Sequence, residues 1–141
     1  MILVDTSGLL SALDASDPRH GASRASLLGD DGPRLLSPFV LAELDYLLTT
    51  RVSTRVARAF LAEVAAGAYQ LERFEADDIA EAGEILDRYA DLDLGLADAS
   101  IVVLAHRHGA VDVLTLDERH FRVVSAGGRR SFRILPADGP R

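Results

Sequence analysis

The sequence contains no cysteine and no lysine, and these two absences exclude several classes of protein. Without cysteine the chain has no disulfide framework and no thiolate zinc site. Without lysine it cannot use P-loop phosphate chemistry or form a Schiff base, and it lacks the lysine that acidic-pocket receiver domains need. All 15 basic residues are therefore arginines, which suit forked recognition of phosphate groups.

The sequence also lacks long apolar runs and an excess of positive charge. No stretch approaches the roughly 18 consecutive apolar residues of a membrane span, and the N-terminus lacks the features of a signal peptide. The formal net charge of −7 argues against broad electrostatic binding of nucleic acid, although a local basic rim around an acidic pocket remains compatible with it. We therefore expect a cytoplasmic protein that does not associate with membranes.

The 141 residues, of which 48% are hydrophobic, suit one domain with a single core. We expect this domain to span residues 1–141, with residues 136–141 as a frayed tail. Predicted strands alternate with predicted helices, which indicates a three-layer α/β/α fold with a mostly parallel central sheet. The strands are expected at residues 2–4, 34–36, 69–74, 110–116 and 131–135.

The first ten residues carry the clearest signal for a functional site. Ile2, Leu3 and Val4 form an apolar run without polar alternation, which is typical of a strand buried on both faces. Asp5 follows at once, where the strand leaves the sheet, and ligands of open α/β sheets bind outside the carboxyl ends of the strands. The alternative interpretation is that Asp5 only caps the next helix.

Three later segments place further acids in similar settings. Glu43 lies in the second turn of a helix that begins at Ser37-Pro38, where serine suits the cap and proline the first helical position. Asp98 begins a very apolar helix, and Asp117 follows the predicted strand 110–116. The plainer interpretations are an exposed helix charge for Glu43 and a simple cap for Asp98.

All four acids can meet at one edge of a parallel sheet. Carboxylates brought together without a basic partner repel one another and raise one another's pKa values, and a divalent cation removes that conflict. Carboxylate ligands without cysteine or an obvious histidine suit Mg²⁺ or Mn²⁺. The spacing therefore predicts an acidic metal site.

The four acidic segments resemble the motifs of PIN-domain ribonucleases. They are Val4-Asp5-Thr6-Ser7, Ala42-Glu43, Leu96-Ala97-Asp98-Ala99, and Thr115-Leu116-Asp117 with Phe121. The length and the motif order resemble VapC-type toxins of bacterial type II toxin–antitoxin pairs, over essentially the whole chain. This resemblance implies an endoribonuclease that depends on Mg²⁺ or Mn²⁺, forms a homodimer, cleaves RNA and is inhibited by a cognate antitoxin protein.

The resemblance also implies roles for individual residues. Asp5, Glu43, Asp98 and Asp117 match the catalytic acids, with Asp5, Asp98 and Asp117 as metal ligands and with Glu43 positioning or deprotonating the attacking water. The residues expected to orient these acids are Thr6, Ser7 and Thr115. Other acids lie near the motifs (Asp45, Asp91, Asp93 and Glu118), so the fourth acidic ligand could be Asp117, Asp93 or Glu118. The expected RNA contacts are Arg119, Arg122, Arg129 and Arg130, with solvated surface arginines as the alternative.

Two other functions fit an acidic α/β pocket less well. A haloacid-dehalogenase-like phosphatase also places its nucleophile after the first strand, but its chemistry needs Asp-x-Asp and a lysine. Here Thr6 and Ser7 follow Asp5, and lysine is absent. A non-catalytic PIN-like binding module would need a broken acidic set, whereas this set is intact.

Overall fold

The computed structural model describes residues 1–139, and five parallel strands form its central sheet. Every neighbouring pair of strands in this sheet is parallel, and β1 lies in the middle with all three of its residues buried. The strands lie in the order β3 (Gln70–Leu71), β2 (Arg34–Leu36), β1 (Ile2–Val4), β4 (Asp112–Leu114) and β7 (Arg133–Leu135). The predicted buried first strand is therefore the centre of the sheet.

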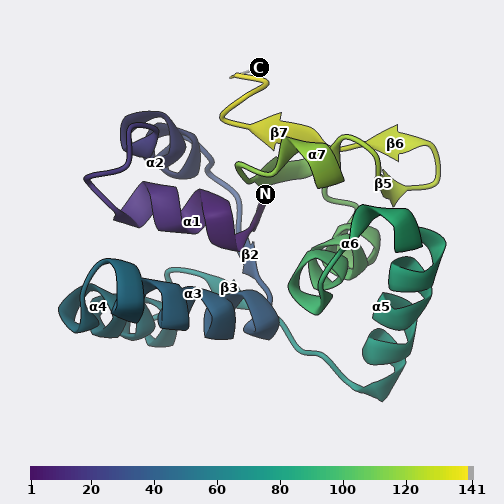
Figure 1. Ribbon diagram of the computed structural model, residues 1–141, viewed down its shortest axis with the longest axis horizontal. Helices are drawn as coiled ribbons and strands as arrows, with labels where there is room; N and C mark the ends of the chain where they lie inside the picture. Colours follow the sequence, from purple (N-terminus) through teal and green to yellow (C-terminus); the bar gives the residue numbers. More distant parts are fainter. Residues whose placement is uncertain (140–141) are drawn as a thin grey trace.

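Helices cover both faces of this sheet. In Figure 1 the helices α1 to α4 lie to the left of the strands, and α5 and α6 lie to the right. This division follows from right-handed crossovers, because the chain moves from β1 toward β3 and then crosses back over the other face to β4. The three-layer α/β/α prediction is confirmed. The helices are α1 (Thr6–Leu13), α2 (His20–Leu28), α3 (Pro38–Arg51), α4 (Thr54–Ala65), α5 (Ala76–Arg88) and α6 (Leu96–His108).

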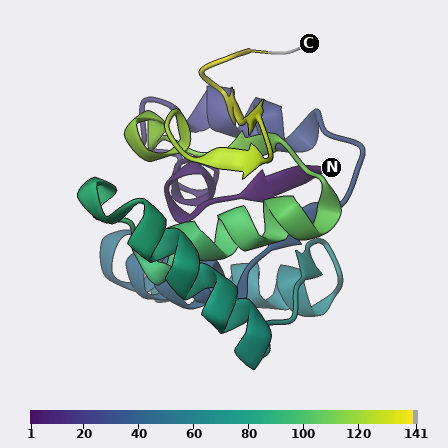
Figure 2. The ribbon, with the colours of Figure 1, turned by 90° about the vertical axis from the view of Figure 1, so that its right-hand side faces the viewer.

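Helix α6 is the most deeply buried helix, and it joins the site to the core. All seven residues from 99 to 105 are buried, and the helix packs against β1 on one side and α5 on the other (Figure 2). It ends at Gly109, whose φ of 65° is a left-handed conformation that favours glycine. Because α6 runs opposite to the strands, its first turn lies at the edge where the strands end.

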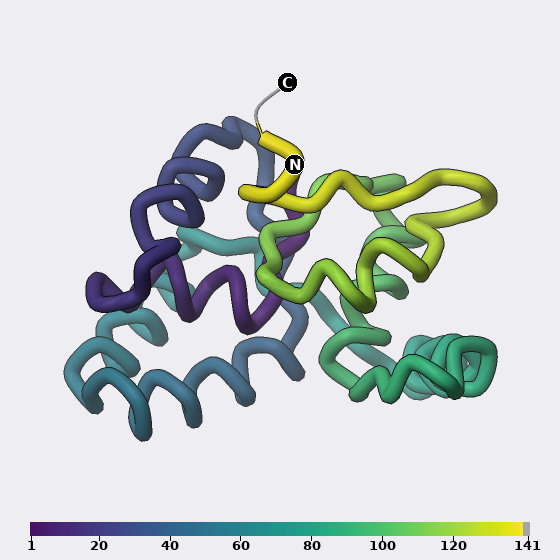
Figure 3. Tube along the Cα trace, turned by 45° about the horizontal axis from the view of Figure 1, so that its top comes forward, coloured from purple at the N-terminus to yellow at the C-terminus, as the bar shows by residue number. Residues whose placement is uncertain are grey.

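The region after β4 differs from the prediction. A short helix, α7 (Glu118–Phe121), follows directly, and an antiparallel hairpin of β5 (Ser125–Gly127) and β6 (Arg130–Ser131) precedes β7. The hairpin reaches out on the side where α5 and α6 lie (Figure 3). The predicted strand 131–135 is interrupted at Phe132, between β6 and β7. The Phe132 ring packs edge-on against Phe121, with 5.4 Å between the ring centroids.

The C-terminal segment is ordered further than we expected. Asp138 accepts a hydrogen bond of 2.7 Å from the backbone N of Ile134, and its carboxylate lies 2.6 Å from a guanidinium nitrogen of Arg122. The prediction of a frayed tail is wrong for residues 136–139, because these contacts hold the turn against β7 and α7. Residues 140–141 lie outside the described part of the chain.

The described residues share one hydrophobic core, which lies on both faces of the sheet. Among residues 1–139, no helix is both long enough and apolar enough to cross a membrane.

Candidate active site

Asp5 leaves the central strand and is held by two hydroxyl groups. Its side chain makes no capping bond to α1, so the capping interpretation is wrong. One carboxylate oxygen accepts hydrogen bonds from Thr115 Oγ1 at 2.6 Å and from Ser7 Oγ at 3.0 Å. The same hydroxyl oxygens accept the backbone N–H groups of Asp117 and Leu116 at 3.0 and 2.9 Å. Ser7 and Thr115 therefore hold Asp5 against the loop after β4.

Thr6 supports Asp5 differently from its two neighbours. Its hydroxyl oxygen is buried and has no hydrogen-bond partner within residues 1–139. Its contribution is a backbone hydrogen bond, which lowers the pKa of Asp5 slightly. The expectation that the Thr6 side chain orients an acid therefore finds no supporting contact.

Burial disfavours the charged form of the Asp5 carboxyl group in the metal-free protein. Burial raises its pKa from 3.8 to about 6, and repulsion from Asp98 adds to that rise. The hydrogen bonds from Thr115 and Ser7 oppose the rise but do not cancel it. Such a raised pKa is typical of a carboxylate that lacks a compensating cation.

Asp98 is the centre of the acidic set. It lies in the first turn of α6, where its carboxylate accepts the backbone N–H of Gly95 at 3.0 Å. Burial raises its pKa, and repulsion from Asp117 and Glu43 adds to the rise, while the Gly95 N–H and the nearby His120 oppose it. Repulsion from Asp98 also raises the pKa of Asp5. Asp98 thus lies within electrostatic reach of each of the other three predicted acids.

Two buried serines join the helices that carry Asp98 and Glu43. Ser37 caps α3 by accepting the N–H of Phe39 at 3.1 Å, and Ser100 donates its own hydrogen to the Ala97 carbonyl at 2.6 Å. Ser37 must therefore donate to Ser100 across their 2.6 Å contact. This chain of hydrogen bonds fixes the start of α6 against the start of α3, while Glu43 itself stays exposed one turn further along.

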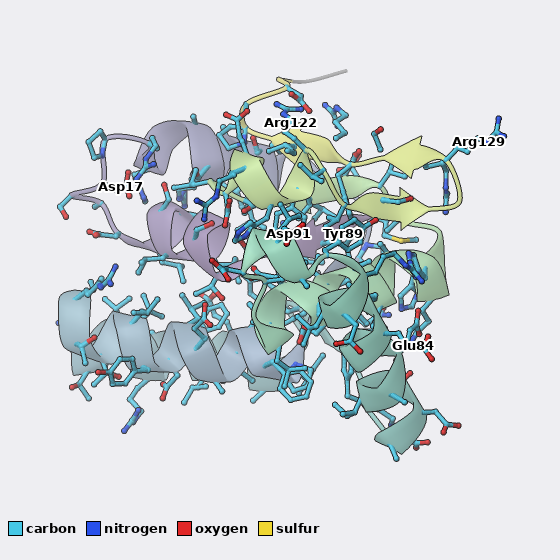
Figure 4. All side chains as sticks on the ribbon, turned by 45° about the vertical axis from the view of Figure 1, so that its right-hand side comes forward. Asp17, Glu84, Tyr89, Asp91, Arg122 and Arg129 are labelled. Carbon is cyan, nitrogen blue, oxygen red and sulfur yellow. The ribbon has the colours of Figure 1, made fainter. Side chains whose placement is uncertain are left out.

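The competing acids lie elsewhere. Asp45 faces Arg58 at 3.7 Å, and Glu118 pairs with Arg122 at 3.0 Å. Asp91 and Asp93 are exposed in the segment before α6, where Figure 4 labels Asp91. The acids that raise the pKa of Asp98 are instead Asp117 and Glu43. Of the three candidates for the fourth acid, Asp117 is the one whose charge raises the pKa of Asp98.

One residue that the sequence interpretation did not single out also lies in the site. His120 is only 6% exposed, and its Nδ1 lies 2.7 Å from Asp117 and 3.9 Å from Asp98, measured to one carboxylate oxygen of each. Its backbone N–H also donates to the other oxygen of Asp117 at 3.2 Å. The available signal was the spacing, because a residue three positions after Asp117 in a helical turn returns to the same side.

The four predicted RNA-binding arginines separate into two groups. Arg119 lies beside the site, with its guanidinium 3.4 Å from His120 Nε2. Arg122 is held by both Glu118 and Asp138. Arg130 donates to the Gly109 carbonyl at the far end of α6, about 16 Å of helix from Asp98, and Arg129 extends from the hairpin tip (Figure 4). Of these four, Arg119 is the one next to the acids.

The donor chemistry of the site fits a hydrated divalent cation. Within residues 1–139, no three His, Asp or Glu side chains lie close enough to enclose a metal ion as they stand. Mg²⁺ commonly binds through one or two carboxylates and keeps several waters, so a closed cage is not required. Asp5, which is buried, and Asp98, which is half-buried, supply the hard oxygen ligands and the negative charge that such a cation needs.

Comparison with known proteins identifies the family to which this chain belongs. The family model described as "PIN domain" matches residues 2–126, so the chain belongs to the PIN-domain family. It is 40% identical to Ribonuclease VapC26 of Mycobacterium tuberculosis over 135 residues, which is 96% of this chain and 100% of that protein.

Two solved structures extend the comparison. Mycobacterium tuberculosis VapC20, described as a sarcin–ricin loop cleaving toxin, has a TM-score of 0.77 and 27% identity and covers 83% of this chain and 90% of its own. VapBC2 from Rickettsia felis, solved bound to a DNA fragment from its promoter, has a TM-score of 0.66 and 20% identity over 95% of this chain and 98% of its own. The second likeness supports the fold alone.

Proposed function

We propose that this protein is the endoribonuclease toxin of a type II toxin–antitoxin pair and that it hydrolyses RNA with a divalent cation. The observation that carries the proposal is the half-buried Asp98 carboxylate, which lies within electrostatic reach of Asp5, Glu43 and Asp117. The 40% identity to a ribonuclease over nearly the whole chain supports the same activity. A haloacid-dehalogenase-like phosphatase finds no support, because the matching family is the PIN domain.

The side chains suggest a division of work within the site. Asp5, Asp98 and Asp117 would hold Mg²⁺ or Mn²⁺, directly or through water, and Ser7 and Thr115 keep Asp5 in place. When bound, the cation supplies a water of lowered pKa and neutralises charge on the leaving oxygen. Glu43, which is exposed beside these acids, would position the attacking water.

The RNA backbone would approach along the side of the site that carries arginine. Arg119 lies next to His120, and Arg19, which also contacts Asp17, lines a hollow of about 290 Å³ together with Thr115. Both guanidinium groups suit phosphate oxygens. The sequence interpretation did not include Arg19, and it gave Arg129 and Arg130 roles that their distance from the acids makes less direct.

The partners follow from the same proposal. A cognate antitoxin would cover the acidic pocket and offer it an arginine in place of the cation. A homodimer would cover exposed apolar side chains on the early helices, such as Leu28 of α2 and Tyr46 of α3. The cytoplasmic location stays a prediction.

The test is a cleavage assay on RNA with the purified protein in Mg²⁺, Mn²⁺ or EDTA. We expect cleavage with either cation and none in EDTA, and cleavage that persists in EDTA would exclude the metal mechanism. Light scattering at micromolar concentration should give the mass of a dimer, and a monomer would remove that part of the proposal. Co-expression with the neighbouring small gene should suppress cleavage if it encodes the antitoxin.

A further inference from the structure

His120 differs from the other three histidines in what its ring contacts. His106 and His108 pair with Glu81 and Glu72 near the far end of α6, and His20 contacts the Ser11 carbonyl. The ring of His120 instead lies between Asp98 and Asp117, at 3.9 and 2.7 Å. Of the four histidines, all within the described residues, it is the one that contacts the acidic set.

The position of this ring is fixed from several directions. The backbone N–H of His120 donates to Asp117, and its carbonyl accepts the N–H groups of Val123 and Val124 at 3.1 and 3.2 Å. The side chain is buried beside Phe121, which belongs to the core. The backbone therefore cannot carry the ring away from the two carboxylates without breaking the turn.

The polar contacts define which ring nitrogen carries the hydrogen. The guanidinium of Arg119 can only donate, so Nε2, which lies 3.4 Å from it, is the accepting nitrogen. Nδ1 then carries the hydrogen and faces the carboxylates. Arg119 thus donates to His120, and the Nδ1 of His120 lies 2.7 Å from a carboxylate oxygen of Asp117.

The contact between Nδ1 and Asp117 is close but poorly aligned. Although the atoms lie 2.7 Å apart, Nδ1 is buried without a hydrogen-bond partner of good geometry within residues 1–139. Burying a polar N–H in this way costs stability, and such groups in folded proteins commonly mark a site where an ion or a functional group completes the arrangement. A small rotation of the Asp117 carboxylate would align the bond.

We propose that His120 is a positioning residue, which holds the Asp117 carboxylate in the orientation that binds the cation. This inference rests on the proposed function of the acidic site. With the carboxylate rotated into line, the ring would donate from Nδ1 to one oxygen of Asp117, and the backbone N–H of the same residue already donates to the other oxygen. Asp117 would then present its free lone pairs toward Asp98. Groups that orient a metal ligand in this way typically change metal affinity or activity by about 10- to 100-fold when removed.

The experiment uses three replacements of His120 in the full-length protein. H120N places an amide nitrogen near the position of Nδ1, H120Q places it near Nε2, and H120L keeps most of the volume without a donor. Each variant is measured for Mn²⁺ binding by calorimetry, for RNA cleavage against Mg²⁺ concentration, and for its melting temperature in EDTA.

We expect H120L and H120Q to raise the dissociation constant for Mn²⁺ and the half-saturating Mg²⁺ concentration by about 10-fold or more. H120N should restore both to within about threefold, because it retains the donor that faces Asp117. At saturating Mg²⁺ the maximal rate should recover much of its wild-type value. In a D117N background H120L should add little further loss, because the two residues act as one unit.

A purely structural role would give a different result. H120L, H120Q and H120N would then lower the melting temperature to different extents but leave the Mn²⁺ dissociation constant unchanged, and this outcome would overturn the proposal. Additive effects of H120L and D117N would also overturn it. If wild-type protein binds Mn²⁺ but cleaves no RNA, the proposed function fails while the calorimetric comparison still decides the role of His120. If wild type binds no Mn²⁺, both fail.

Discussion

Acids lie at both ends of helix α6, in opposite electrostatic settings. At its first turn Asp98 faces three other carboxylates, and burial raises the pKa values of Asp98 and Asp5. At its last turn Arg107 and His108 contact Glu72, and Arg107 also contacts Asp78 at 3.0 Å. We call the first group the acidic edge (Asp5, Glu43, Asp98, Asp117) and the second the paired network (Glu72, Asp78, Arg107, His108).

The pKa values of the paired network shift in the other direction. Burial alone would raise the pKa of Glu72, but hydrogen bonds from Gln70, His108 and Arg107 lower it overall. The pKa of Asp78 is lowered first by the backbone N–H of Glu75 and then by Arg107. Arg107 also lies over the Phe74 ring at 5.3 Å.

The comparison separates acids that stabilise the fold from acids that cost it stability. In the paired network each charge has a partner, so the network helps to fix β3 and α5 against the end of α6. At the acidic edge, residues 1–139 supply hydroxyl groups, backbone N–H groups and one histidine, but no arginine that pairs with a carboxylate of the set. Carboxylates arranged in this way are ready for a cation or for a basic group from a partner.

The largest effect that tests this comparison is expected for D98N. Asparagine keeps the shape and can still accept the Gly95 N–H, so the fold should be retained. Loss of the central charge should lower RNA cleavage by at least about 100-fold, given what a metal-activated water contributes. In EDTA the melting temperature should rise slightly, because repulsion with Asp5 and Asp117 is removed.

The matched control is E72Q in the paired network, which should leave RNA cleavage unchanged. Both variants are assayed on RNA in Mg²⁺ and melted in EDTA. An active D98N protein would show that the acidic edge is not the catalytic site, and a D98N protein that melts below wild type in EDTA would contradict the repulsion argument.

The second effect is a pH dependence of stability that comes from Asp5. Its pKa is about 6 in the folded protein and near 3.8 when unfolded, so the folded state binds a proton more tightly. In EDTA the preference of the folded state for protonated Asp5 therefore stabilises the protein fully below pH 4. This stabilisation falls as the pH rises toward 6 and is lost above pH 6. The difference amounts to about 2–3 kcal/mol.

Urea unfolding of wild type and D5N in EDTA between pH 4 and pH 8 measures this contribution. The stability of D5N relative to wild type should increase as the pH rises from 4 to 7, because asparagine carries no charge to bury. A difference that stays constant over this range would show that Asp5 keeps an ordinary pKa. Adding Mg²⁺ at pH 7 should stabilise wild type more than D5N.

The third effect is a loss of stability from E72Q. The Glu72 carboxylate accepts from His108, Arg107 and Gln70, and a neutral amide would leave charged donors poorly matched. We expect the free energy of unfolding to fall by about 1–3 kcal/mol. E84Q on the exposed face of α5, labelled in Figure 4, should change it by less than about 0.5 kcal/mol. Equal losses in both variants would remove the distinction between paired and solvated acids.

The smallest effect concerns the arginine nearest the acidic edge. R119A should weaken RNA binding by about 3- to 10-fold. It should also reduce the slope of log KM against log salt concentration by about one, which corresponds to the loss of one phosphate contact. R129A, at the hairpin tip, should change neither. The measurement is cleavage kinetics at several salt concentrations, and a larger effect from R129A would place the RNA path over the hairpin.

Much of the acidic edge could be predicted from the sequence because its acids follow recognisable elements. Asp5 follows a wholly apolar strand, and Ser37-Pro38 begins the helix that carries Glu43. Parallel strands end at one edge of a sheet, so acids at these ends meet whatever the details of packing. The absence of lysine and cysteine then narrowed the chemistry to carboxylates and arginines.

The tertiary structure alone decided which charges find partners. Local sequence gives Asp117, Asp93 and Glu118 similar settings, yet packing brings Arg122 to Glu118 and turns Asp117 toward Asp98. The same packing carries Arg130 to the far end of α6 and brings His120 between two acids. These outcomes depend on contacts between segments far apart in the chain, which residue type and local spacing do not specify. The residues that can form a site could therefore be identified from the sequence, whereas the fold determines which of their charges are paired.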